Sequence, residues 1–166
     1  YEWLSWISST LESKGEIYDY FGIIRPTNPI RNFSTIRRAW NLFKSNKKAD
    51  SLRAVQLCSE HPAKMWRIRG EYMNPIIENS SSKYPMHSMQ YSSLEETYVQ
   101  NASLEIACTS VIKDHRNISG DKILPFISKG YEGFDLNKNE DWFLLEKLIE
   151  KKIISLDSIR IDPFKF

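Results

Sequence analysis

The chain has 166 residues and a formal net charge of +2, with 41% hydrophobic, 13% aromatic and 27% charged residues. This length predicts a single domain, residues 1–166, and this composition excludes a disordered or fibrous protein. Lysines and arginines are spread along the sequence, whereas a nucleic-acid-binding protein usually concentrates its basic charge. We therefore expect no nucleic-acid partner.

The cysteines and the hydropathy of the chain indicate its compartment. Cys58 and Cys108 lie far apart in the sequence without a metal-ligand spacing, which is typical of free thiols in a reducing cytoplasm. No stretch is long and apolar enough for a membrane span, and the N-terminal segment lacks the basic head of a signal peptide. The sequence thus predicts a cytoplasmic protein with no membrane partner.

Helical and strand patterns alternate in the first part of the chain. Apolar residues at helical spacing predict a helix over residues 2–14. The apolar run at residues 18–25 is typical of a strand that is covered on both faces. A helix with Ser34 as its N-cap follows, and then a second strand within "ADSLRAVQLC". This order predicts an α/β fold with an open, mostly parallel, Rossmann-like sheet and flanking helices.

The middle of the chain departs from this alternation. Residues 59–97 are rich in proline and polar residues, and we expect an inserted flap or dimerisation arm with a small hairpin that turns at Gly70. The strand pattern returns in "TYVQNASLEIACTSVI". A turn with spaced glycines then leads into a helix, for which Asn137 or Asn139 is the expected N-cap.

The loop "RPTNPIR", which follows the predicted strand at residues 18–25, is the first candidate for a binding site. Pro26 and Pro29 hold it extended, so its polar groups are presented with little entropy to lose. Ligands in open α/β sheets bind at such strand ends. An ordinary proline-rich connection with solvated Arg25 and Arg31 explains the same pattern equally well.

Other polar residues also have two interpretations. Asp135, Asn137 and Asp141 offer the oxygen ligands that Mg²⁺ prefers, but a carboxylate near the start of a helix is more commonly there because of the helix dipole. Lys64 has the pattern of a surface lysine. Asn101 lies in an apolar strand and needs a polar partner if it is buried.

Four segments taken together resemble one protein family. In order, "IIRPTNPIR", "ADSLRAVQLCSEHPAKMW", "YVQNASLEIA" and "GFDLNKNEDW" are similar to motifs of the acylneuraminate cytidylyltransferases, the CMP-sialic acid synthetases. The resemblance covers residues 15–150. It implies that CTP and a nonulosonic (sialic-type) acid react to give pyrophosphate and a CMP-sugar for surface glycan or lipopolysaccharide synthesis. Mg²⁺ would neutralise charge on the phosphates.

The resemblance also implies roles for individual residues. Asp135 and Asn137 would bind Mg²⁺, and Asp135 and Arg31 would act in catalysis. The residues expected to bind substrate are Arg25, Thr27, Asn28, Lys64, Gln90 and Asn101. Members of the family dimerise through an arm that matches the inserted segment, so a homodimer is expected.

The sequence departs from the family pattern in ways that affect these expectations. Asn137 stands where many members have a second metal-binding aspartate, and Met89 stands where an arginine is expected. The family's A-R-G-G-S-K loop, which holds the CTP triphosphate, has no counterpart before residue 15. We therefore expect a sheet that is incomplete on its N-terminal side, an exposed apolar edge at residues 18–25, and little turnover by this chain alone.

Two alternatives remain open at this point. The chain could be a related nucleotidyltransferase that acts on another sugar, or a non-catalytic dimerising remnant. The first alternative predicts turnover of CTP with a non-acidic sugar, for which basic residues would have no carboxylate to bind.

Overall fold

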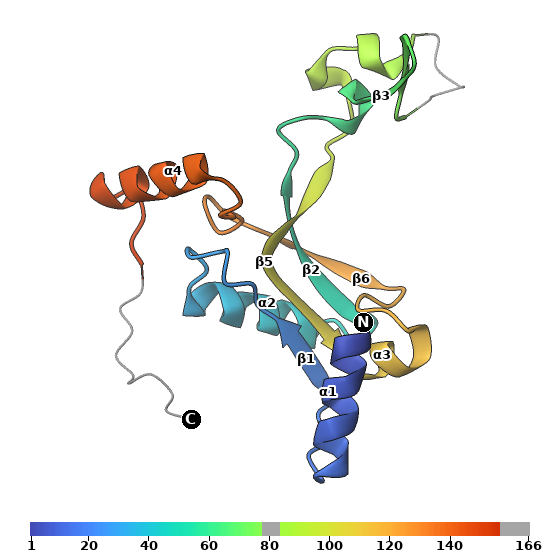
Figure 1. Cartoon of the computed structure of the whole chain (residues 1–166), viewed down its shortest axis with the longest axis vertical. Coiled ribbons are helices and arrows are strands. Elements are labelled where there is room, and N and C mark those ends of the chain that lie inside the picture. The colour runs from blue at the N-terminus through green and yellow to red at the C-terminus, as the bar shows by residue number, and fades with distance from the viewer. Residues whose placement is uncertain (78–83, 157–166) are drawn as a thin grey trace. The chain divides into compact units, whose positions relative to one another are not determined.

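The computed structural model describes residues 1–77 and 84–156 (Figure 1). The chain divides into two compact units. In the described part, unit 1 consists of Tyr1–Val55 and residues 100–156, and unit 2 lies within Gln56–Val99.

Unit 1 is built on a four-stranded sheet with the strand order β1-β5-β2-β6 (Figure 1). The strands are β1 (Tyr20–Ile23), β2 (Ser51–Leu57), β5 (Tyr98–Cys108) and β6 (Ile123–Ile127). β1 and β5 are antiparallel, and β2 and β6 are parallel. β5 also runs antiparallel to β2, because the backbone N–H of Cys108 donates to Asp50 and that of Cys58 donates to Thr97.

This topology contradicts the predicted open, mostly parallel, Rossmann-like sheet. The long strand β5 lies between β1 and β2 and is antiparallel to both, so the sheet is mainly antiparallel and curls into a half-barrel. The prediction was wrong because an apolar run shows that a strand is buried but does not determine its direction. Residues 103–107 of β5 are all buried, as a central strand of either kind would be.

Four helices accompany this sheet in the described part of unit 1: α1 (Glu2–Ser13), α2 (Phe33–Ser45), α3 (Ser110–His115) and α4 (Asn139–Glu150). α1 agrees with the helix predicted over residues 2–14. Both predicted N-caps are wrong, since α2 is capped by Asn32, whose side chain accepts from the N–H of Thr35, and the N-cap of α4 is Lys138. None of these helices, nor any other among the described residues, has the length and apolar character needed to cross a membrane.

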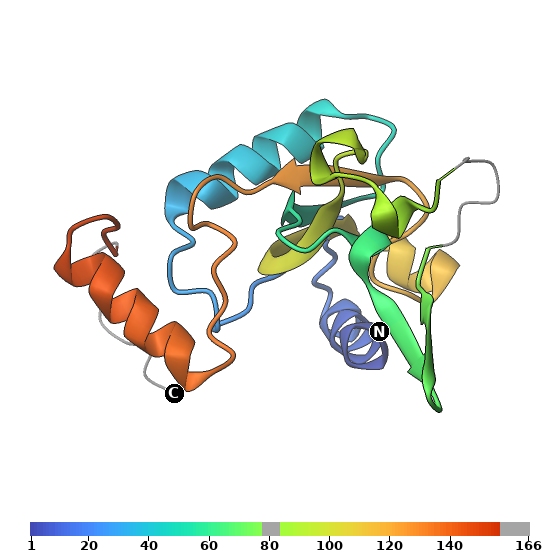
Figure 2. The ribbon, with the colours of Figure 1, turned by 90° about the horizontal axis from the view of Figure 1, so that it is seen from above.

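The core of unit 1 lies between α2 and the sheet, and α2 runs along the strands in the view from above (Figure 2). Its buried side chains are Ala39, Phe43, Leu52, Ala54, Leu104, Ile106 and Phe126. Fully burying a large apolar side chain stabilises a fold by about 1.5–3 kcal/mol. At the edge of this core the ring of Tyr20 meets Trp40 edge-on, with 5.3 Å between ring centroids. The core therefore fixes β1 and β5, which carry the candidate site.

Unit 2 contains the antiparallel hairpin of β3 (Trp66–Arg69) and β4 (Tyr72–Pro75), in which Ile68 lies opposite Met73. The predicted turn at Gly70 is confirmed, and its φ of 64° is a conformation that glycine adopts without a steric penalty. The unit also has three short 3-10 helices, η1 (Pro62–Lys64), η2 (Met86–Ser88) and η3 (Tyr91–Ser93). The segment predicted as an arm, residues 59–97, falls within this unit.

Candidate functional site

The loop that follows β1 is fastened to the segment that precedes α4. Asn28 is buried, its side-chain amide donates to the backbone oxygen of Glu132 at 2.7 Å, and its Oδ1 accepts from the N–H of Arg31 at 3.0 Å. The backbone oxygen of Thr27 accepts from the N–H of Leu136 at 2.8 Å. Two motifs that are about 100 residues apart in sequence are thus joined at one place.

Arg31 points into the protein and bonds backbone carbonyls. One terminal nitrogen lies 2.6 Å from the oxygen of Ser103, and both terminal nitrogens lie 3.2 Å from the oxygen of Arg25. Burial lowers the pKa of the Arg31 guanidinium from its ordinary value, but an arginine remains protonated. Arg31 therefore ties the loop to β5.

Three of the residues predicted from separate motifs lie together around one cavity. Arg25, Gln100, Asn101 and Asp135 line an open space of about 240 Å³. Ligand pockets commonly measure about 300–1,000 Å³, so this space suits one polar group or a small part of a substrate. Thr27, Asn28 and Arg31 are not in its lining and instead shape the loop behind it.

Asp135 contributes a carboxylate with one unsatisfied oxygen. Its Oδ2 accepts from the side-chain amide of Asn137 at 2.8 Å. Its Oδ1 is buried and has no hydrogen-bond partner within residues 1–77 and 84–156. Leaving a buried acceptor unpaired costs about 1–3 kcal/mol, so this atom is suited to receive a cation or a donor from a ligand.

The side-chain oxygens at this turn supply only part of the ligand set of a Mg²⁺ ion. Asp135 and Asn137 offer two oxygens, and the described residues contain no group of three or more His, Cys, Asp or Glu side chains that could hold a metal ion. Mg²⁺ is commonly held by one or two carboxylates together with waters and substrate phosphates. The residues present are compatible with that arrangement.

Asp141 has the structural role that is usual at a helix start. Its Oδ2 accepts from the backbone N–H groups of Asn137 at 2.9 Å and Lys138 at 2.8 Å. These bonds lower the pKa of Asp141. Asp141 therefore satisfies the first turn of α4 and leaves Asp135 as the candidate ligand.

Asn101 has the polar partners that its place in an apolar strand required. Its side-chain nitrogen donates to Oγ of Ser128 at 3.0 Å, and its Oδ1 accepts from the N–H of Ser103 at 3.1 Å. Gln100, beside it in β5, also lines the cavity and was not predicted, because no motif singled it out.

A buried ion-pair cluster lies next to this cavity and was also missed. Glu105 is only 4% exposed, and its two carboxylate oxygens lie 2.6 Å from Arg25 and 2.7 Å from Arg53. Arg53 continues the cluster, since its Nε lies 3.1 Å from Oγ of Ser119. The available signal was an acidic residue within the apolar run "LEIAC", the same signal that drew attention to Asn101.

The other two predicted substrate-binding residues, Lys64 and Gln90, belong to unit 2. Nζ of Lys64 donates to the backbone oxygens of His87, at 2.7 Å, and Met89, and it lies 5.6 Å from the ring centroid of Tyr91. Gln90 is exposed and is the N-cap of η3. Within unit 2, Lys64 thus joins η1 to the segment around η2.

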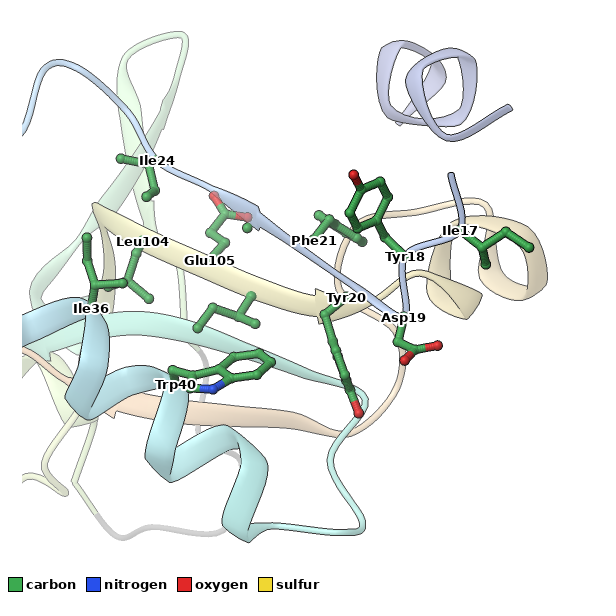
Figure 3. A pocket seen from close by; sticks show the side chains of 12 residues that line it. Ile17, Tyr18, Asp19, Tyr20, Phe21, Ile24, Ile36, Trp40, Leu104 and Glu105 are labelled. Atoms are coloured by element: carbon green, nitrogen blue, oxygen red, sulfur yellow. The ribbon is translucent and has the colours of Figure 1, made fainter. Parts of the chain in front are cut away.

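A second cavity, of about 490 Å³, lies beside β1 and is mainly apolar (Figure 3). Its apolar lining includes Ile17, Tyr18, Phe21, Ile24, Ile36, Trp40, Leu104 and Ile106. Sites that orient a substrate combine apolar walls with a few convergent polar groups. The larger cavity also has the carboxylates of Asp19 and Glu105 in its lining. The smaller cavity is lined by polar residues alone, and three of them, Arg25, Asn101 and Asp135, come from the motifs, so it is the better candidate for chemistry.

A comparison with protein-family models finds no match to this sequence, and a search of curated proteins also finds none. The candidate site is therefore defined by the geometry above and by the four motifs.

Proposed function

We propose that this protein transfers CMP from CTP to a nonulosonic acid, releasing pyrophosphate. The observation that supports this proposal is the small polar cavity, where Arg25, Asn101 and Asp135 come together from three of the four motifs. Free thiols at Cys58 and Cys108 are compatible with a cytoplasmic enzyme.

The residues of the cavity suit the parts of a sugar acid. The guanidinium of Arg25 is half-exposed and can bind a carboxylate through two parallel hydrogen bonds. The side-chain amides of Gln100 and Asn101 offer donors and acceptors to sugar hydroxyls. Binding in a fixed orientation would place the anomeric hydroxyl for attack on the α-phosphorus of CTP.

Asp135 and Asn137 are the residues that would hold Mg²⁺. When bound, Mg²⁺ neutralises charge on the phosphates during nucleotidyl transfer. Asp135 itself lines the cavity, and its buried Oδ1 has no hydrogen-bond partner among the described residues. We expect Asp135→Ala to lower turnover far more than it weakens sugar binding.

A nucleotidyltransferase for a neutral sugar is the second candidate. The observation that favours it is the ion pair of Arg25 with Glu105, which offsets part of the charge that a carboxylate would meet. A non-acidic sugar would bind through the amides of Gln100 and Asn101 instead.

A binding titration distinguishes these candidates. N-acetylneuraminic acid and the neutral N-acetylmannosamine would each be titrated into the protein by calorimetry, with Mg²⁺ and CTP present. We expect the acid to bind more tightly, and we expect Arg25→Ala to weaken it about tenfold or more, as for loss of a charged hydrogen bond. Arg37→Ala, an exposed arginine on α2, is the matched control.

The possible results separate cleanly. Failure of the acid to bind, or equal weakening by both arginine variants, would count against the proposed function. Preference for the neutral sugar would favour the second candidate. Transfer itself is measured as formation of the CMP-sugar by mass spectrometry after long incubation, because little turnover is expected of this chain alone. A rate that is unchanged in Asp135→Ala would remove Asp135 from the mechanism.

A further inference from the structure

Both the backbone and the side chain of Arg25 are held by neighbouring residues. Its backbone oxygen accepts from the guanidinium of Arg31 at 3.2 Å, and its own guanidinium lies 2.6 Å from Oε1 of Glu105. The side chain is still 47% exposed and lines the small polar cavity. One part of the guanidinium is thus fixed while the rest faces the site.

Glu105 is itself held from the opposite side. Its Oε2 has no hydrogen-bond partner among the described residues, but it forms an ion pair with Arg53, whose Nη1 lies 2.7 Å away. Arg53 in turn lies 3.1 Å and 2.5 Å, through Nε and a terminal nitrogen, from Oγ of Ser119. Glu105 is on β5, opposite Ile23 of β1, and Arg53 is on β2. The ion pairs therefore connect β2 and β5 to the loop that follows β1.

A carboxylate as buried as Glu105 is costly to place in a protein unless it is paired with positive charge. Here the cost is offset by two arginines, and one of them, Arg53, is 13% exposed and does not line the cavity. The second pairing leaves Glu105 fixed even while Arg25 engages a ligand. An acidic side chain on the protein surface would hold Arg25 less firmly than the buried Glu105, because exposed ion pairs are weak and their side chains move.

We propose that Glu105 is a positioning residue that fixes the guanidinium of Arg25 in the candidate site, and that Arg53 keeps Glu105 in place. The inference rests on the proposed function, in which Arg25 receives the carboxylate of a sugar acid. Guanidinium has five N–H donors in a planar fork, so binding Glu105 through one terminal nitrogen leaves others for a second carboxylate. Ordering Arg25 before the ligand arrives lowers the entropy lost on binding.

The test is a double-mutant cycle of Arg25→Ala and Glu105→Gln, with N-acetylneuraminic acid as the probe. We expect Glu105→Gln alone to raise the dissociation constant about tenfold, the upper range for ordering one long side chain. In the Arg25→Ala background, Glu105→Gln should change it by less than about twofold, because a residue that acts through Arg25 has nothing left to position. Equal weakening in both backgrounds, or no effect in either, would overturn the proposal.

A second measurement needs no ligand. The terminal N–H groups of Arg25, followed by nitrogen-15 NMR, should exchange with water clearly faster in Glu105→Gln than in the wild type, because Nη2 donates to Oε1 of Glu105. Arg53→Lys keeps a positive charge beside Glu105 but loses the bonds to Ser119, so it should give a smaller change of the same sign. Unchanged exchange in Glu105→Gln overturns the positioning role, whatever the ligand.

These readouts keep the two proposals apart. Altered Arg25 exchange with no binding of N-acetylneuraminic acid to the wild type would reject the proposed function and retain the positioning role. If N-acetylneuraminic acid binds, but the double-mutant cycle shows no coupling between Arg25 and Glu105 and the Arg25 exchange is unchanged, the positioning role is rejected and the proposed function is retained. Thermal unfolding of each variant confirms that the folded protein is compared, and Arg53→Lys gives the test a second route if Glu105→Gln does not fold.

Discussion

Asn28 offers the sharpest test of how the loop after β1 is built, and the perturbation is Asn28→Ala. The substitution removes two hydrogen bonds, to Glu132 at 2.7 Å and from Arg31 at 3.0 Å, each worth about 1 kcal/mol. It also leaves buried backbone groups without their partner, at a cost of about 1–3 kcal/mol. We expect the free energy of unfolding to fall by about 2–4 kcal/mol.

Urea unfolding followed by tryptophan fluorescence measures this loss. Asn41→Ala, on an exposed position of α2, is the matched control and should change the free energy of unfolding by less than about 0.5 kcal/mol. Nitrogen-15 NMR of the same variant would show whether the guanidinium signal of Arg25 shifts. A shift is expected because the loop that Asn28 fastens begins at Arg25. A loss below about 1 kcal/mol for Asn28→Ala would refute the view that Asn28 anchors the loop.

The remaining predictions concern stability, pH and assembly. Gly120→Ala should lower the melting temperature, because Gly120 has a φ of +64° and an added Cβ would lie 2.4 Å from Cγ of Asp50. Burial raises the pKa of Glu132, but hydrogen bonds from Arg38, the N–H of Lys129 and Thr35 outweigh it and leave that pKa lowered. The stability due to Glu132 is therefore present above its unfolded pKa of about 4.3 and lost as pH falls through the lower folded pKa, so Glu132→Gln should flatten this part of the acid unfolding curve. Ile68→Asp, on the exposed hairpin of unit 2, should convert the expected homodimer to a monomer, as measured by light scattering.

Each of these has a control and a contrary result. Gly15→Ala shares a positive φ of 81° but would meet no atom within 4 Å, so a loss as large as that of Gly120→Ala would argue against a clash with Asp50. Glu140→Gln, on the exposed first turn of α4, should leave more of the acid sensitivity intact than Glu132→Gln. Lys47→Asp, on an exposed turn of unit 1, should leave the mass unchanged, and a wild-type monomer would reject the dimer.

Local features of the fold could be predicted from the sequence. The helix at Glu2–Ser13 and the turn at Gly70 depend on spacing and on backbone freedom within a few residues. Strand direction could not be predicted, because the antiparallel placement of β5 results from pairing with partners far away in the chain. The predicted N-cap of α2 was wrong by two residues. Asn32 and Ser34 are both suitable N-cap residues, and the backbone geometry selects Asn32.

The residues of the candidate site also fall into those that could be predicted from the sequence and those that could not. Arg25, Asn101 and Asp135 were named from motifs, and the structure places them around one cavity. Glu105 and Arg53 escaped prediction because each is an ordinary charged residue in sequence, and only the pairing of β5 with its neighbours brings them together. Patterns within a segment cannot reveal an ion pair between segments.

The position of β1 at the edge of the sheet has a consequence for amide exchange. The N–H of Thr109 donates to Asp19, so the residues of β1 that face β5 are Phe21 and Ile23, while Tyr20 and Gly22 turn their backbone groups away from it. Deuterium uptake should therefore alternate along β1, slow at Phe21 and Ile23 and fast at Tyr20 and Gly22. Any strand that docks on this edge would erase the alternation, which makes one short peptide of the protein a reporter of what binds there.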